Sequence, residues 1–185
     1  MIDAASRLLW RQGLHATGLN EILKESRAPR GSLYFHFPGG KEELATEAVV
    51  LAGNGITKGL AEIFDRHASL DEALADFADL FASVMEHSHY SLGCPLATVT
   101  LEVAATTETL RAACEAIYTD WERLIADKAE ASGWDAASAA SVATLILSAI
   151  EGALLLSRAR HNTAPLHSVT DQLIRLVRTT DPTGR

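Results

Sequence analysis

The sequence predicts an all-α protein, and three observations support that fold class. Apolar residues recur at the i, i+3, i+4 and i+7 spacing of an amphipathic helix in successive segments of the 185-residue chain. The composition, with 48% apolar and only 6% aromatic residues, is typical of a globular protein built from helices rich in Ala and Leu. Near the N-terminus, two short helical patterns are separated only by a brief turn. We therefore expect about nine helices, of which the first three form a small head.

The head begins with two helices that the sequence delimits clearly. Residues 2–12 carry an apolar stripe, and Gly13 is expected to end this helix as a C-cap would. A second helix is expected over residues 18–26. Thr17 lies in its N-cap region, and Glu21 lies near the position that completes a capping box.

The stretch from residue 29 to 44, PRGSLYFHFPGGKEEL, predicts the functional site of the head. Leu33 and Phe37 are four residues apart and can pack inward from one helical face, whereas Tyr34 and His36 point elsewhere and carry polar tips. A short helix that follows another after such a brief turn forms a helix-turn-helix, whose second helix enters the DNA major groove. The side chains and backbone groups expected to suit phosphate oxygens and base edges are those of Arg30, Gly31, Ser32, Tyr34, His36 and Lys41.

This region resembles the N-terminal DNA-binding domain of the TetR family of transcriptional repressors, over residues 2 to about 51. The residues that carry the resemblance are LLWRQGLHATGLNEILKESRAPRGSLYFHFPGGKEELATEAV, above all GSLYFHF followed by KEEL, and the G-x-x-A-T before the second helix. The segment GCPLATVTLEVA and the form FPGGKEEL are similar to one subgroup, the lincomycin-resistance and flavonoid-responsive repressors. The resemblance implies a homodimer that binds operator DNA and is released by a small-molecule effector.

The resemblance also assigns roles to two residues and exposes two departures. A Thr or Ser at the position of Thr17 touches a phosphate in the family, so Thr17 is expected to contact DNA as well as to cap its helix. Relatives usually have Gly where this chain has Arg27, so Arg27 must either accept a positive φ or use a different turn, and its charge can reach a phosphate. The basic residues that commonly precede the first helix in the family are missing, which indicates either weaker binding or an incomplete start.

The distribution of charge is compatible with a DNA-binding head. The net charge is −8, but the first 52 residues contain six Lys or Arg residues and six acidic residues, so the whole deficit lies after Ala52. DNA affinity follows local phosphate contacts and not the global sum. The two cysteines, Cys94 and Cys114, fit a reducing cytoplasm better than a disulfide framework, and Cys94 is more simply a small buried residue than a redox sensor. No segment matches an export signal, and no apolar run reaches the ~18 residues that span a bilayer, so we expect a cytoplasmic protein.

A long helix from Lys41 to about residue 64 is expected to join the head to the body of the protein. Gly53, Gly55 and Gly59 lie in its middle, which indicates either a hinge or loose packing. We place the domain boundary there, giving a DNA-binding domain over residues 1–52 and a helical ligand-binding and dimerisation domain over residues 53–185.

The body contains apolar helical stripes over residues 70–89 and 109–131, which either form an ordinary core or line a cavity. If the family mechanism applies, a small, largely apolar or aromatic effector binds between these helices and spreads the two heads of the dimer. The predicted effector-binding residues are Phe77, Phe81, Met85, Leu101, Tyr118, Trp121, Ile125 and Glu151. Glu151 is alternatively the partner of an Arg side chain, because buried carboxylates are seldom left unpaired.

Two C-terminal helices, over residues 136–160 and 167–177, are expected to pair with their copies in a four-helix dimer interface. The first is apolar nearly all round, and a monomer of this size would struggle to cover it. The predicted dimerisation residues are Leu145, Ala149, Gly152, Ala153, Leu156, Leu173, Ile174 and Val177.

The sequence argues against an enzyme, a metal site or a cofactor. It contains no nucleophile-elbow, zincin, P-loop or dinucleotide-binding motif, and pairs of acids such as Glu102 with Glu108 are common on solvated helix faces. His87 and His89 are two residues apart and so lie on different faces of a helix, which disfavours metal ligation. The alternative to a regulator is a non-enzymatic helical interaction module that does not recognise DNA. That alternative leaves the cluster from Arg30 to Lys41 unexplained.

Overall fold

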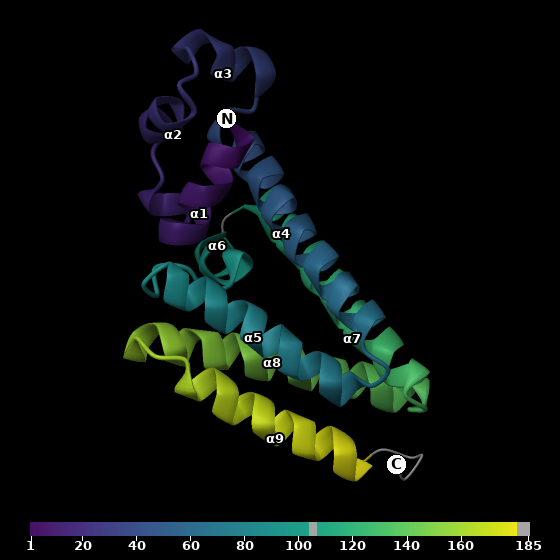
Figure 1. Ribbon diagram of the computed structural model, residues 1–185. Coiled ribbons are helices and arrows are strands. Elements are labelled where there is room, and N and C mark those ends of the chain that lie inside the picture. Colours follow the sequence, from purple (N-terminus) through teal and green to yellow (C-terminus); the bar gives the residue numbers. More distant parts are fainter. Residues whose placement is uncertain (104–106, 181–185) are drawn as a thin grey trace. The chain divides into compact units, whose positions relative to one another are not determined.

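The computed structural model describes residues 1–103 and 107–180, and all regular structure in those ranges is helical (Figure 1). This confirms the predicted all-α fold and, within the described residues, the expected nine helices. They are α1 (Ile2–Ala16), α2 (Leu19–Ser26), α3 (Arg30–His36), α4 (Lys41–Arg66), α5 (Leu70–His87), α6 (Pro95–Val103), α7 (Glu108–Ala131), α8 (Ala136–Arg160) and α9 (Ala164–Thr180).

By their internal packing, the described residues fall into two compact units. The first consists of Met1–Ile56 with Cys94–Ile117, and the second consists of Thr57–Gly93 with the chain from Tyr118 onward. Residues 94–103 and 107–117 thus pack with the N-terminal residues, although they lie far along the chain. The predicted division into residues 1–52 and 53–185 concerns function and stays a prediction.

The first unit is built around the short helices α1, α2 and α3. Each helix places small or branched apolar residues on one face, and α1 packs on both α2 and α6. Pro95 begins α6, as expected for a residue without a backbone donor at the first helical position. The side chains buried in this part of the unit include Ala5, Leu8, Leu9, Ile22, Leu23, Leu33, Phe37, Leu44, Ala48, Leu96 and Val99.

Gly13 interrupts α1 without ending it, which corrects the expected boundary. Its backbone adopts φ 78° and ψ −177°, and helical structure then continues to Ala16. Thr17 does not cap the second helix, because the N-cap residue of α2 is Gly18. The Thr17 side chain is instead fully buried, and its hydroxyl donates to the carbonyl oxygen of Gly13 at 2.6 Å. The Thr17 hydroxyl, which was expected to cap α2, therefore bonds the carbonyl of Gly13 at the break in α1.

Arg27 adopts the left-handed conformation that glycine usually supplies at a helix C-terminus. Its φ is 54° and its ψ is 28°. The next amide, that of Ala28, donates to the carbonyl of Leu23 at 3.1 Å, in the manner of a helix-terminating turn. Of the two alternatives left by the sequence, the first holds, because the turn keeps the positive φ and Arg27 carries the strain.

In the second unit, α9 packs on both α5 and α8. Arg178 in α9 donates to a carboxylate oxygen of Asp71 in α5 at 2.7 Å. Burial favours the neutral form of Asp71, but hydrogen bonds from Ser69 and Arg178 outweigh it and lower the pKa of this carboxyl. At the start of α5, Ser69 occupies the N-cap position without capping the helix through its side chain. By contrast, Asp135 caps α8 by accepting from the amides of Ala137 and Ser138.

The expectation that no segment is apolar enough to span a membrane was wrong for α8. By length and composition alone it is apolar enough to cross a membrane, although the sequence was expected to contain no such segment. Figure 1 shows α8 beside α9, and 44% of its most apolar window is buried within the chain. One such helix is weak evidence for a membrane span, because the core helix of a globular protein can have the same length and composition.

Gly53 of α4 lies against Ile117 of α7 within the first unit. A Cβ atom at this position would lie 2.7 Å from Cγ2 of Ile117, whereas a Cβ at Gly55 would have open space around it. Loose packing, one of the two explanations offered for these glycines, is therefore wrong at Gly53. The absent side chain allows a close helix–helix contact.

The variants Gly53→Ala and Gly55→Ala should change stability in opposite directions. Overpacking against Ile117 should lower the free energy of unfolding by about 1–3 kcal/mol in Gly53→Ala. The exposed Gly55→Ala should raise it by roughly 0.5–1 kcal/mol, because alanine is the better helix former. Urea unfolding followed by circular dichroism measures both, and equal effects of the two changes would contradict the close contact.

Candidate nucleic-acid interface

The short helix α3 is held by one face and exposes the other. Leu33 and Phe37 are both buried, as their spacing predicted. On the opposite side, Tyr34 is 62% exposed and Phe35 is 82% exposed, and His36 is exposed as well. The helix therefore presents consecutive ring side chains to solvent, two of which carry hydrogen-bonding groups.

Phe35 is a residue that the sequence-based list of DNA contacts left out. Tyr34 and His36 were chosen for their polar tips, which a phenylalanine lacks. The periodicity nevertheless contains the signal, because a residue two positions from both Leu33 and Phe37 lies roughly 200° around the helix from each. A large, exposed apolar side chain between Tyr34 and His36 suits contact with the methyl group of thymine.

The start of α3 is organised by side chains of its own and of α2. One terminal nitrogen of Arg30 donates to the side-chain oxygen of Asn20 at 3.0 Å, which orients the guanidinium. The hydroxyl of Ser32 donates to the carbonyl of Pro29 at 2.6 Å. Gly31 is exposed, and a Cβ there would meet no atom within 4 Å, so a ligand can approach its backbone closely.

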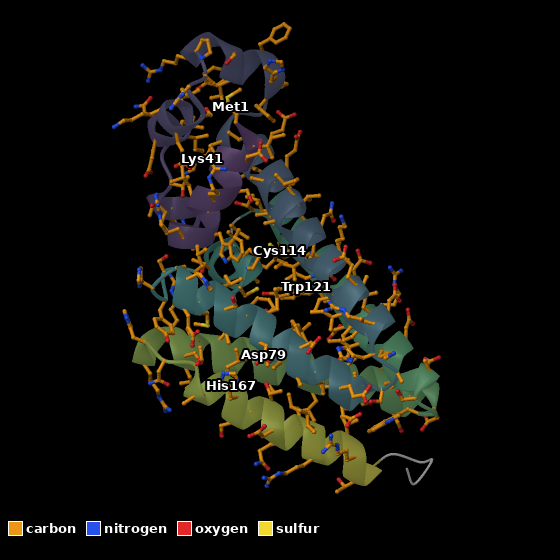
Figure 2. All side chains as sticks on the ribbon, in the orientation of Figure 1. Met1, Lys41, Asp79, Cys114, Trp121 and His167 are labelled. Carbon is orange, nitrogen blue, oxygen red and sulfur yellow. The ribbon has the colours of Figure 1, made fainter. Side chains whose placement is uncertain are left out.

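Lys41, which is labelled in Figure 2, begins α4 and is half-buried. Its ammonium group donates to the carbonyl oxygen of Leu14 at 2.7 Å. A cation at a helix N-terminus opposes the helix dipole, and a phosphate partner would remove that conflict. The structure supplies a different compensation in the Leu14 carbonyl. An ammonium group has three donors, so Lys41 retains the capacity to bind a phosphate as well.

The two remaining predicted DNA contacts, Arg27 and Thr17, differ in their exposure to solvent. Arg27 is exposed and sits in the turn between α2 and α3. Thr17 has no exposed side-chain surface, and its hydroxyl is bonded to Gly13, so we leave it out of the interface. The surface formed by Arg27, Arg30, Gly31, Ser32, Tyr34, Phe35, His36 and Lys41 is called the α3 surface below.

Four of the predicted effector-binding residues, all in the second unit, form two aromatic pairs. The rings of Phe77 and Phe81 pack edge to face with their centroids 5.2 Å apart. The rings of Tyr118 and Trp121 do the same with a centroid distance of 5.5 Å. The indole nitrogen of Trp121, a residue labelled in Figure 2, donates to the hydroxyl of Thr57 at 2.8 Å.

The other predicted effector-binding residues have mixed environments. Met85 and Ile125 are fully buried, and Glu151 is half-buried. Leu101 belongs to the first unit and is 82% exposed. An effector site and an ordinary core both accommodate the buried residues, so these assignments stay predictions.

The predicted dimerisation residues lie on α8 and α9 with different degrees of exposure. Ala153, Leu173 and Val177 are buried within the chain, Ala149 and Ile174 are half-buried, and Gly152 is exposed. Leu145 and Leu156 are 48% and 45% exposed. A groove on the same two helices is lined by residues that include Ala149, Val169, Leu173 and Leu176.

The acids that an enzyme would need are engaged in structural contacts. Glu108 forms ion pairs with Arg111 on an exposed face of α7, and Glu102 accepts hydrogen bonds from the backbone amides of Leu14 and His15. Burial raises the pKa of the Cys114 thiol, which disfavours a reactive thiolate. Among the described residues, no group of three His, Cys, Asp or Glu side chains is arranged to hold a metal ion.

Comparisons with known proteins match both halves of the chain. The family described as "Bacterial regulatory proteins, tetR family" matches residues 1–48, and the family described as "Transcriptional regulator LmrA/YxaF-like, C-terminal domain" matches residues 71–172. YxaF of Bacillus subtilis (strain 168), an uncharacterised HTH-type transcriptional regulator, is 39% identical over 178 residues, which cover 96% of this chain and 93% of YxaF. The HTH-type transcriptional regulator LmrA of the same organism is 36% identical over 166 residues, which cover 90% of this chain and 88% of LmrA.

Solved structures agree with this assignment at the level of the fold. The regulatory protein TetR from Rhodobacter sphaeroides has a TM-score of 0.84 at 24% identity, with 94% of this chain and 95% of that chain covered. A TetR transcriptional regulator from Chloroflexus aurantiacus J-10-FL has a TM-score of 0.82 at 25% identity, with 97% of this chain and 92% of that chain covered. The chain therefore belongs to the TetR family of bacterial regulatory proteins, and it is a transcriptional regulator with a helix-turn-helix DNA-binding domain, not an enzyme.

Proposed function

We propose that this regulator is a repressor that binds operator DNA as a homodimer and is released by a small, largely apolar or aromatic effector in the cytoplasm. The observation that carries the proposal is the α3 surface. Leu33 and Phe37 fix the helix, so that Tyr34, Phe35 and His36 project together beside Arg30. This combination supplies phosphate contacts, base-edge contacts and an apolar contact from one short helix.

The homodimer is supported by the aliphatic side chains that α8 and α9 leave exposed. Leu145, Leu155 and Leu156 are exposed on α8, and Leu176 is exposed on α9. A second copy that covers these residues would form a symmetric interface in which each chain contributes the same surface. The dimer would present two α3 helices, and successive major grooves on one side of the duplex are ~34–36 Å apart.

Release by an effector requires a different affinity of the effector for two arrangements of the dimer. The Phe77–Phe81 and Tyr118–Trp121 ring pairs support an apolar or aromatic effector, because rings bind such molecules through stacking and edge contacts. A titration of the DNA-bound protein with small aromatic compounds tests this part. Release that persists in Phe81→Ala and Trp121→Ala at unchanged compound concentrations would contradict the assigned site.

DNA binding is tested by retention on duplex DNA at low and moderate salt. Tyr34→Phe and Lys41→Ala should weaken binding to every duplex and flatten the dependence of affinity on salt, because each removes a phosphate contact. Arg30→Ala should instead change which duplexes are preferred, because a guanidinium reads the edge of guanine. A wild-type protein that ignores all duplexes would favour the alternative, a helical interaction module.

Two controls separate loss of contact from loss of structure. Glu115→Gln, on the exposed face of α7, changes charge away from the α3 surface and should leave DNA retention unchanged. Thermal unfolding of Lys41→Ala is required, because Lys41 also donates to the Leu14 carbonyl. An unchanged salt slope in both Tyr34→Phe and Lys41→Ala would remove these residues from the interface, and equal losses for Arg30→Ala on all duplexes would make Arg30 a phosphate contact.

The oligomeric state is tested by charge placed on α8. Leu145→Glu and Leu156→Glu should shift the protein from dimer to monomer in sedimentation, because a buried unpaired carboxylate opposes association strongly. Leu51→Glu on α4 is the matched control, since Leu51 is 43% exposed and lies outside the predicted interface. Sedimentation of both α8 variants as wild-type dimers would exclude this face.

A further inference from the structure

The polar contacts around Gly13 point to a link between α6 and the start of the helix-turn-helix. Backbone amides that follow a break in a helix lose the carbonyl partners four residues back, and they must find other acceptors. In α1 the break is Gly13, and the amides of Leu14 and His15 follow it. Both donate to the same carboxylate oxygen of Glu102, in α6, at 2.5 and 2.9 Å. Glu102 thus acts as a helix cap supplied from 88 residues away.

Gly13 is what allows α6 to approach this closely. A Cβ atom at Gly13 would lie 2.9 Å from the carboxyl carbon of Glu102 and 2.9 Å from Cγ2 of Thr98. The φ of 78° is also a conformation that L side chains rarely adopt. The break at Gly13 therefore leaves the amides of Leu14 and His15 without partners inside α1. The missing side chain of Gly13 leaves the space that the Glu102 side chain occupies.

The same junction is held from its other side by α4. The Leu14 carbonyl accepts from the ammonium group of Lys41 at 2.7 Å, and the Gly13 carbonyl accepts from the hydroxyl of Thr17 at 2.6 Å. Side chains from α6, from α4 and from Thr17 at the end of α1 thus bond the backbone of residues 13–15. His15 adds a weaker contact, since its Nδ1 lies 3.5 Å from Glu102.

We infer that Glu102 is a positioning residue that couples the location of α6 to the orientation of the helix-turn-helix; the inference rests on the proposed DNA-binding function. Two hydrogen bonds from amides to one carboxylate are charge-assisted, and such bonds are short and directional. Because α2 begins four residues after His15, α6 cannot shift without moving the start of α2 or breaking both bonds. Along the chain, α6 follows α5, which carries the proposed effector contacts Phe77, Phe81 and Met85.

Coupling predicts an effect of DNA binding on α6 that a contact with only a stabilising role does not predict. If α6 and the helix-turn-helix are linked, binding at either one must change the free energy of rearranging the other by the same amount. DNA bound to the α3 surface must therefore protect the amides of α6 against hydrogen exchange, and this effect must depend on Glu102.

The experiment uses the full chain and a duplex that the protein itself selects from a randomised pool. Residue-resolved hydrogen exchange is measured with and without this duplex for wild type, Glu102→Gln and Glu102→Ala. Glu115→Gln is the matched control, because Glu115 is an exposed acid whose partner Arg111 lies on its own helix. In Glu102→Ala the Leu14 and His15 amides should exchange at least about tenfold faster than in wild type, in line with loss of a hydrogen bond to a charged group.

Glu102→Gln should give an intermediate rate, because its amide oxygen accepts both bonds without the charge. In wild type and Glu115→Gln, DNA should slow exchange in Leu96–Val103, and in Glu102→Ala this slowing should disappear. If Glu102→Ala does not fold, Glu102→Gln carries the test, with about half of the slowing expected on a logarithmic scale.

Two outcomes overturn the inference. The first is protection of Leu14 and His15 that does not change in the Glu102 variants, and the second is slowing of α6 exchange that keeps its full wild-type size in them. A wild-type protein that selects no duplex at all would instead refute the proposed function, and the inference with it. Retention of DNA with no response in α6 would refute the coupling alone.

Discussion

Burial of Leu33 and Phe37 is the constraint on which the proposed interface depends. A helix of seven residues is too short to be stable alone, so α3 exists because these two side chains enter the core of the first unit. Anchoring one face fixes the rotation of the helix and hence the direction of Tyr34, Phe35 and His36. The apolar contact and the polar surface are thus two consequences of one four-residue spacing.

Much of the fold follows from local pattern. The four-residue spacing of Leu33 and Phe37 identified the buried face of α3, and Pro95 marked the first residue of α6, because both depend on the geometry of a single helix. The errors arose where distant residues decide the outcome. Thr17 has every property of an N-cap, yet its hydroxyl closes the break at Gly13, and no local rule reveals that break. Glu102 appeared to be one acid among many on a solvated helix, because its partners lie on α1.

The candidate site was predictable in part for the same reason. Arg30, Tyr34 and His36 are exposed on a short helix, as the motif indicated, whereas Phe35 was overlooked because its side chain has no polar group. The phosphate contact expected of Lys41 stays a prediction, and the structure adds a hydrogen bond from its ammonium group to the Leu14 carbonyl. Local sequence therefore indicates where the candidate site lies, and tertiary packing determines which of its side chains are exposed.

Arg27 has a consequence for how this protein tolerates change. Its left-handed backbone costs roughly 1–2 kcal/mol relative to glycine, a cost that natural variation at this position could remove. Replacement of Arg27 by glycine would also remove one of the six Lys or Arg residues in the first 52 residues, close to the exposed start of α3. Selection for a more robust head and selection for a more cationic head therefore act in opposite directions on one codon.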